Sequence, residues 1–271
     1  MISQLSALIL GLVEGFTEFL PISSTAHLIL TSQVLGIPQS NFAKSFEIAI
    51  QSGAILAVLA LYWRKFLNPE TLKKIIVAFI PTGILGLVFY QVVKNYLLGD
   101  IAVVLWALGI GGVLLIIFEY LFKKKTDARE IPDDKLTAEG DTAKSDDLKS
   151  VSYKKAFCVG IFQSVAMIPG VSRAAATIIG GMLMGIRRST IVEFSFLLAV
   201  PTMLAATDLD LVKNLDAFSS SEFGIISIGL VASFLTAILS IKFLLRYIEK
   251  HTFTSFGIYR IVLALAFLLV I

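Results

Sequence analysis

The chain of 271 residues is 56% hydrophobic and 16% charged, with a formal net charge of +3. Its mean hydropathy of +0.85 and its repeated apolar runs predict several crossings of a hydrocarbon core about 30 Å thick. Because the runs are nearly continuous and do not alternate, they favour an all-α polytopic membrane protein over a membrane β-barrel. No basic stripe interleaved with aromatic residues occurs, which excludes nucleic acid as a predicted partner. The single cysteine, Cys158, excludes an intrachain disulfide and a thiolate metal site.

The first apolar run has no basic segment before it and contains Glu14 and Glu18, so we interpret it as mature structure and not as a cleaved signal peptide. The shortest predicted helices form two consecutive pairs. Pro21 interrupts the first pair, and Pro169 with Gly170 interrupts the second. The helices are predicted over residues 2–20, 22–36, 42–63, 73–94, 101–122, 154–168, 172–186, 189–206, 223–247 and 254–271.

Charged residues dominate residues 123–153, which we interpret as a solvated linker between a first half, residues 1–122, and a second half, residues 154–271. With three spanning helices after each short pair, the linker lies on the face opposite the two termini. Most basic residues then share the linker face, so the positive-inside rule predicts a cytoplasmic linker and both termini on the outer, periplasmic side. These residues are Arg64, Lys65, Lys73, Lys74, Lys123, Lys124, Lys125, Arg129, Lys135, Lys144, Lys149, Lys154, Lys155, Arg187, Arg188, Arg246 and Lys250, against Lys44, Lys94 and Lys213 on the other face.

The two halves resemble each other weakly. Aligning the four residues that end at Glu14 with the four that end at Gln163 brings the two interrupting prolines within one residue of each other, and a one-residue gap then pairs Ser24 with Ser172. We therefore predict an inverted-topology repeat with two re-entrant helix pairs and six transmembrane helices. Interrupted hydrophobic segments at corresponding positions of two halves indicate a binding site at the repeat interface.

Glu14 and Glu18 lie four residues apart, which places both carboxylates on one helix face about one turn apart. Two like charges there repel each other unless a cation, a shared proton or water lies between them. Because one or two carboxylates together with substrate phosphate are the usual ligands of Mg²⁺, we predict a metal site for Mg²⁺ or Ca²⁺ on this pair. The alternative is a solvated helix face at the membrane interface.

Three hydroxyl residues and a histidine follow Pro21. Ser23 or Ser24 is expected to cap the next helix, whose free N–H groups then point into a polar pocket. Ser24 and His27, three residues apart on one helix face, are candidates for nucleophile and base. Ser23 and Thr25 are candidate substrate-binding residues.

The second interruption, from Pro169 to Arg173, has the features of an anion site. Pro169 and Gly170 end one helix, and Ser172 is expected to cap the next, whose N-terminus offers unpaired N–H donors and a partial positive charge. Arg173 adds a guanidinium fork that matches phosphate. We predict that Gly170, Ser172 and Arg173 bind substrate; an arginine that extends to the membrane surface is the alternative.

Glu47, Glu193 and Arg260 also lie in apolar helices, but none lies beside a helix break, so we interpret them as structural or supporting pairs. If the two interruptions meet tip to tip near the membrane midplane, they bring together two carboxylates, a hydroxyl, an imidazole and a guanidinium. Such groups are costly in lipid unless they face a polar cavity or one another. Together they are the parts of a phosphoryl-transfer site.

The sequence resembles a known family at these residues. EGFTEFLPISSTAH, which begins at Glu14, and PGVSRAAAT, which begins at Pro169, are similar to the two signature motifs of the undecaprenyl-diphosphate phosphatase family, also called bacitracin-resistance proteins. FEIAIQSGAILAV, EFSFLLAVP and YRIVLALAF resemble the family too, so the resemblance covers essentially the whole chain. It implies a bacterial inner-membrane enzyme that removes one phosphate from undecaprenyl diphosphate and regenerates the lipid carrier for cell-wall synthesis. The implied fold is an inverted repeat with re-entrant pairs and a site open to the outer face.

The resemblance also implies roles for individual residues. The chain departs from the family pattern at Ala174 and Ala175, where serine and glycine are usual, and at Ala26, where glycine is common. A hydroxyl at position 174 is therefore dispensable here. The residues that match are Glu14 and Glu18 in the acidic motif, Ser24 and His27 in the serine-histidine motif, and Ser172, Arg173 and Thr177 in the phosphate-binding motif.

We hypothesise that a polyprenyl diphosphate enters from the outer leaflet, is neutralised by Mg²⁺ and Arg173, and loses its terminal phosphate. Attack by Ser24 with His27 as base, and attack by His27 with help from a glutamate, are both open, with Ser24 favoured. The rival function is a polyprenyl-phosphate transporter or flippase that uses the same site, since fold alone does not choose. A membrane scaffold would leave the buried charges without a use. Membrane lipid is the other predicted partner, and the sequence is compatible with a homo-oligomer.

Overall fold

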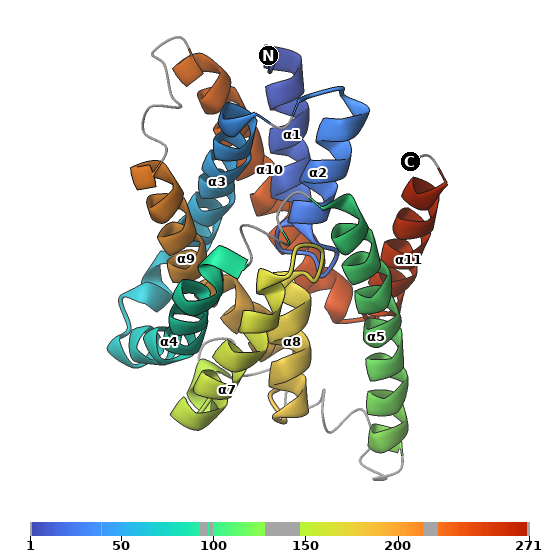
Figure 1. Cartoon of the computed structure of the whole chain (residues 1–271). Coiled ribbons are helices and arrows are strands. Elements are labelled where there is room, and N and C mark those ends of the chain that lie inside the picture. The colour runs from blue at the N-terminus through green and yellow to red at the C-terminus, as the bar shows by residue number, and fades with distance from the viewer. Residues whose placement is uncertain are drawn as a thin grey trace.

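The computed structural model describes residues 2–38, 40–92, 97, 100–127, 147–213 and 222–269. Every regular element in these ranges is helical, as predicted (Figure 1). The first half contains α1 (Gln4–Thr17), α2 (Ser24–Val34), α3 (Asn41–Phe66), α4 (Pro69–Val92) and α5 (Ile101–Asp127). The second half contains the short helix η2 (Asp147–Ser150), then α7 (Tyr153–Ser164), η3 (Val165–Met167), α8 (Arg173–Leu183), α9 (Arg188–Lys213), α10 (Phe223–Ile248) and α11 (Thr254–Leu268).

Several of these helices are long and apolar enough to cross a membrane, which makes this a multi-pass membrane protein. Within the described ranges they are Phe42–Phe66, Pro69–Phe89, Ile101–Phe122, Arg188–Asp208 and Phe223–Ile248. The sixth predicted span, residues 254–271, corresponds to α11, which has 15 residues and ends at Leu268. The count of six therefore stays a prediction.

Helices extend into both ends of the predicted linker, residues 123–153. α5 continues to Asp127, and η2 begins at Asp147. Residues 128–146, the central part of the predicted linker, lie outside the described residues. The C-terminal end of α5 and the N-terminal end of α7 lie at one end of the bundle, and the outer ends of α1 and α11 lie at the other (Figure 1). This arrangement agrees with a linker on the face opposite the termini.

Two hairpins of short helices approach each other from opposite ends of the bundle. α1 and α2, with 14 and 11 residues, form the first hairpin, and α7 and α8, with 12 and 11 residues, form the second. Their tips meet in the middle of the molecule (Figure 1). Each break follows from its proline, because Pro21 and Pro169 disfavour helical geometry in the residue that precedes them.

The two breaks share an unusual backbone geometry. Ser23 caps α2 with φ +72°, and Ser172 caps α8 with φ +76°; within the described ranges these are the non-glycine residues with positive φ. Left-handed backbone costs an L-residue roughly 1–2 kcal/mol. The shared geometry corrects the sequence alignment, since Ser172 corresponds to Ser23 and not to Ser24. No gap is then needed, because the number of residues from Gly11 to Ser23 equals the number from Gly160 to Ser172.

Helix packing relates the two halves in the same way. α1 packs along α10, and α7 packs along α4. A methyl group at Gly11 would overlap the carbonyl oxygen of Gly229, and one at Gly160 would overlap that of Ala78, so both hairpins approach a neighbouring backbone at a glycine. Further contacts between the halves are those of α3 with α9 and α10, of α4 with α9, and of α5 with α11. An internal twofold relation would produce this exchange of partners.

Candidate active site

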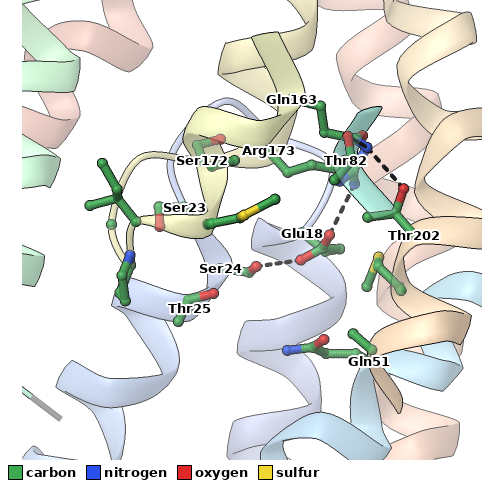
Figure 2. Close-up of a pocket in the computed structure, with 17 residues that line it drawn as sticks. Glu18, Ser23, Ser24, Thr25, Gln51, Thr82, Gln163, Ser172, Arg173 and Thr202 are labelled. Atoms are coloured by element: carbon green, nitrogen blue, oxygen red, sulfur yellow. Dashed lines mark hydrogen bonds and ion pairs between the residues drawn. The ribbon is translucent and has the colours of Figure 1, made fainter. Parts of the chain in front are cut away.

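A cavity of about 260 Å³ lies between the tips of the two hairpins. Its wall combines polar side chains from both tips with apolar ones such as Met167, Ile168 and Met203, so it suits a ligand with a polar head and an apolar tail. Residues of α3, α4 and α9 close the side opposite the tips (Figure 2). The polar lining residues are Glu18, Ser23, Ser24, Thr25, Gln51, Thr82, Gln163, Ser172, Arg173 and Thr202.

An ion pair joins the two hairpins at this cavity. Arg173 Nη2 of α8 donates to Glu18 Oε1 at 2.9 Å, and the side chains are only 11% and 7% exposed. The hydroxyl of Ser24 donates to the other carboxylate oxygen of Glu18 (Figure 2). Glu18 thus links a hydroxyl from its own hairpin with a guanidinium from the other hairpin. The prediction that the two motifs meet is correct for these residues.

The guanidinium of Arg173 is held from behind by α9. Nη1 donates to the backbone oxygen of Ser195 at 2.8 Å and to its hydroxyl at 3.3 Å. That hydroxyl lies 2.7 Å from Thr177 Oγ1. Thr177 is fully buried behind the guanidinium, and the cavity lining does not include it. Arg173 Nε has no acceptor among the described residues, which leaves a buried donor for an anionic ligand.

Glu14 lies one helical turn before Glu18 along the chain, and the cavity lining does not include it. It is fully buried, and neither carboxylate oxygen has a hydrogen-bond donor among the described residues. A buried carboxylate without donors is costly unless a cation or a proton neutralises it. The pair therefore fits the predicted cation site in its donor chemistry. It supplies only two carboxylates, because the described residues contain no cluster of three acidic, histidine or cysteine side chains.

The structure does not bring His27 to Ser24. His27 Nδ1 lies 2.7 Å from the backbone oxygen of Ser23, and Nε2 lies 2.8 Å from the hydroxyl of Tyr259 on α11. The His27 and Tyr259 rings also stack, with centroids 5.6 Å apart. His27 is 8% exposed and does not line the cavity. The expected partner of Ser24 is thus replaced by Glu18, because the turn after α1 folds back over the start of α2.

The remaining predicted binding residues lie at the cavity. Ser23, Thr25, Gly170 and Ser172 all line it. The capping predictions are confirmed: Ser23 Oγ accepts from the N–H of residue 26 at 3.4 Å, and Ser172 Oγ accepts from that of residue 175 at 3.2 Å. Both helix N-termini therefore face the cavity region with their partial positive charge.

An uncharged polar wall of the cavity was not predicted. Gln163 Nε2 donates to Thr82 Oγ1 on α4 and to Thr202 Oγ1 on α9, both at 3.0 Å. Gln163 Oε1 is buried and has no partner among the described residues. Each threonine directly follows a proline inside a long helix, Pro81 or Pro201. A polar residue directly after a proline within an apolar helix was the available signal.

Three further charged residues in apolar helices, Glu47, Glu193 and Arg260, were predicted to be structural. Ser32 donates to Glu47 Oε1 at 2.7 Å, and Lys65 Nζ lies 3.3 Å from Glu193 Oε1, so the prediction of structural pairing is confirmed for both glutamates. Arg260 also has a structural role, as interpreted, but in space it lies beside the helix breaks. Its guanidinium contacts the backbone at both of them.

The fold and this site define a multi-pass membrane protein with a cavity between two hairpins that is lined by a buried ion pair. A family model described as "Bacitracin resistance protein BacA" matches residues 7–266. A Sulfurihydrogenibium protein named undecaprenyl-diphosphatase is 48% identical over 98% of this chain and 99% of its own length. Proteins with the same name from Aquifex aeolicus and Persephonella marina are each 46% identical over 98% of this chain and over 97% and 98% of their own lengths. The chain belongs to the BacA bacitracin-resistance protein family.

Proposed function

We propose that this protein is an undecaprenyl-diphosphatase, which hydrolyses undecaprenyl diphosphate to undecaprenyl phosphate and inorganic phosphate. The reaction recycles the lipid carrier of cell-wall synthesis. One observation carries the proposal: the Ser24 hydroxyl donates to the same carboxylate, Glu18, that the Arg173 guanidinium binds. A nucleophile, a proton acceptor and a phosphate-binding cation then share one cavity. The names of the relatives support the same activity.

The proposed reaction begins with an exchange of anions at Arg173. The terminal phosphate takes the place of Glu18 on the guanidinium, and Arg173 Nε supplies a further donor. Ser24 Oγ then attacks the terminal phosphorus while its proton passes to Glu18. The bond between phosphorus and the bridging oxygen breaks, and undecaprenyl phosphate leaves as an anion that requires no proton. A phosphoserine results.

Water completes the reaction in the second step. It attacks the phosphorus of the phosphoserine, and the bond to Ser24 Oγ breaks. The departing seryl oxygen takes back the proton that Glu18 holds, and the water protons leave with the product phosphate. Glu18 is again free to form its ion pair with Arg173.

Glu14 and the Glu18 oxygen that Ser24 does not contact would hold the cation that the donor chemistry of this site fits. Bound Mg²⁺ neutralises phosphate charge and stabilises the negative charge of the transition state. The described carboxylates leave the remaining ligand positions to water and substrate phosphate, as is usual for Mg²⁺. Carboxylate oxygens are ligands of both Mg²⁺ and Ca²⁺, so both belong in the assay.

The arrangement of the site relative to the membrane is also proposed. An inner-membrane location, a cytoplasmic linker and termini on the outer side follow from the positive-inside rule. The repeat, with hairpins that are re-entrant in the bilayer, is supported by the two left-handed serine caps and by the exchange of packing partners. The cavity would then receive its lipid substrate from the outer leaflet.

The test is phosphate release from a polyprenyl diphosphate by the purified protein in detergent. We expect release with Mg²⁺, loss with a chelator, and loss of at least about 10³-fold in Ser24→Ala, as for other removed nucleophiles. Ser32→Ala is the matched control, because it removes a buried hydroxyl of the same helix that donates to Glu47 and does not line the cavity. A wild-type protein that releases no phosphate but moves the lipid between leaflets would make it a transporter.

A trapped phosphoenzyme distinguishes the two candidate nucleophiles. Phosphate on Ser24 would be stable to acid and labile to base, whereas phosphate on the His27 ring would be labile to acid. We expect the acid-stable form, because both ring nitrogens of His27 are engaged away from the cavity. An acid-labile label would show that His27 attacks.

A further inference from the structure

We infer that Arg260 is a positioning residue that fixes the two helix breaks relative to each other. Nη1 donates to the backbone oxygen of Pro21 in the first break at 3.3 Å and to that of Val171 in the second at 2.9 Å. Nη2 donates to the backbone oxygen of Gly170, also in the second break, at 2.9 Å. One guanidinium thus binds both hairpin tips at once.

The remaining donors of Arg260 anchor the same guanidinium to α5. Nη2 donates to the backbone oxygen of Ala107 at 3.1 Å, and Nε donates to that of Leu108 at 3.2 Å. All five N–H groups of the side chain therefore have a carbonyl acceptor. The residue is fully buried, and the described ion pairs include no carboxylate partner for it. A buried charge persists only when its hydrogen bonds are satisfied, so the backbone oxygens hold the side chain in one place.

The bound carbonyls flank the groups that react. Pro21 lies midway between Glu18 and Ser24, and Val171 lies two residues before Arg173. The contact of Glu18 with Arg173 therefore depends on the distance between the two breaks. A misplacement of about 1 Å can reduce a rate about 10²-fold. Arg260 acts through these residues, since it does not line the cavity.

Gly111 provides the space that the guanidinium occupies. A methyl group at Gly111 would overlap Arg260 Nη2, whereas one at Gly109, two residues earlier on α5, would have its nearest neighbour, Ala264 Cβ, at 3.8 Å. The backbones of α5 and α11 pack directly against each other at Gly112 and Gly257. Gly257 lies about one helical turn before Arg260 on α11. Gly111→Ala thus displaces the guanidinium without changing Arg260, and Gly109→Ala is the matched control.

The first experiment compares Arg260→Lys, Gly111→Ala and Gly109→Ala in the purified full chain. The lysine keeps the charge but has three donors on a single nitrogen, which cannot reach both breaks and α5. We expect at least about a tenfold fall in kcat for Arg260→Lys and Gly111→Ala, and kcat near wild type for Gly109→Ala. Wild-type kcat in Arg260→Lys would overturn the inference.

A double-mutant cycle separates positioning from general stabilisation. If Arg260 acts by placing Arg173, the loss caused by Arg260→Lys should shrink to about twofold or less in an Arg173→Lys background. If Arg260 only stabilises the fold, the losses should multiply and should follow the fall in melting temperature and in the amount of folded protein. The multiplied result would overturn the inference.

This kinetic readout rests on the proposed function, so a binding readout accompanies it. A short prenyl methylenediphosphonate, whose phosphonate bridge cannot be hydrolysed, tests whether the cavity binds a diphosphate head. We expect its affinity to fall at least about tenfold in Arg260→Lys and Gly111→Ala but not in Gly109→Ala. If the wild type binds this probe without releasing phosphate from the lipid substrate, the proposed function fails and the positioning role is still tested. Equal affinities in all variants would contradict the role.

Discussion

The two hairpins have the same backbone turn but opposite chemistry. Both turns place a serine with positive φ at a helix cap, Ser23 in the first and Ser172 in the second. The residue after the cap is Ser24, a candidate nucleophile, in one hairpin and Arg173, a cation, in the other. One turn geometry therefore presents different functional groups at the same place, and the cavity forms where the two turns meet.

The carboxylate of the first hairpin and the guanidinium of the second neutralise each other. Burying a single carboxylate or guanidinium in lipid is costly, whereas the ion pair of Glu18 with Arg173 satisfies both. A diphosphate that binds Arg173 replaces one anion by another, so the cavity does not gain an uncompensated charge. The guanidinium of Arg173 is thus already placed to bind an anion.

The largest expected effect comes from removing the cation of the second hairpin. Arg173→Ala should lower kcat/KM by about 10³-fold or more, because phosphoryl transfer loses a cation that stabilises its transition state. Arg173→Lys should recover only part of the loss, since it lacks the planar fork. Phosphate release from the lipid substrate measures both.

A second arginine-glutamate pair provides the control for this change. Arg188 Nη2 lies 2.8 Å from Glu119 Oε2 and also joins the two halves, but neither residue lines the cavity. Arg188→Ala should lower the melting temperature and leave kcat near wild type. Equal losses of activity in the two alanine variants would mean that Arg173 is structural.

An intermediate effect is expected at the position where the first hairpin has a glutamate and the second has a glutamine. Glu14 and Gln163 occupy corresponding positions, so Glu14→Gln gives the first hairpin the residue of the second. Because one metal-binding carboxylate is lost, the Mg²⁺ concentration for half-maximal activity should rise at least about tenfold. A metal titration of phosphate release measures the shift, and an unchanged midpoint would remove Glu14 from the cation site.

The reverse exchange should act on stability. Gln163 Nε2 donates to Thr82 and Thr202, and a glutamate at this position cannot donate when ionised. Gln163→Glu should therefore lower the free energy of unfolding by about 1–3 kcal/mol, the cost of leaving buried polar groups without partners. Thermal unfolding of the detergent-solubilised protein is the measurement, with the Mg²⁺ midpoint expected to stay constant.

The smallest effect is expected at Tyr259. Tyr259→Phe removes the 2.8 Å hydrogen bond to His27 and keeps a ring that can stack. A single neutral hydrogen bond contributes about 0.5–1.5 kcal/mol, so kcat/KM should fall by no more than about tenfold. The second hairpin has Ala176 at the position of His27 and no counterpart of this contact. A loss above about 10³-fold would make the imidazole a reacting group.

The sequence predicted the features that local chemistry determines. Pro21 and Pro169 mark the breaks, and the serines that follow them cap the next helices. The meeting of the breaks was predicted from their number and polarity. The partner of Ser24 was not, because spacing along a helix suggested His27, whereas the turn returns the chain to Glu18. Arg260 was interpreted as a supporting residue, but its place at the two breaks was not predicted, because its acceptors are backbone oxygens, which leave no pattern in the side chains.

The ion pair between the hairpins has a consequence for biosynthesis. Glu18 and Arg173 are 155 residues apart along the chain, which corresponds to roughly 10–30 s of synthesis at typical translation rates. During that interval the first hairpin carries its carboxylates without their guanidinium partner. We expect the first hairpin to stay at the membrane–water boundary, or to keep its carboxyl groups protonated, until the second half is made. It would reach its final depth in the membrane only then.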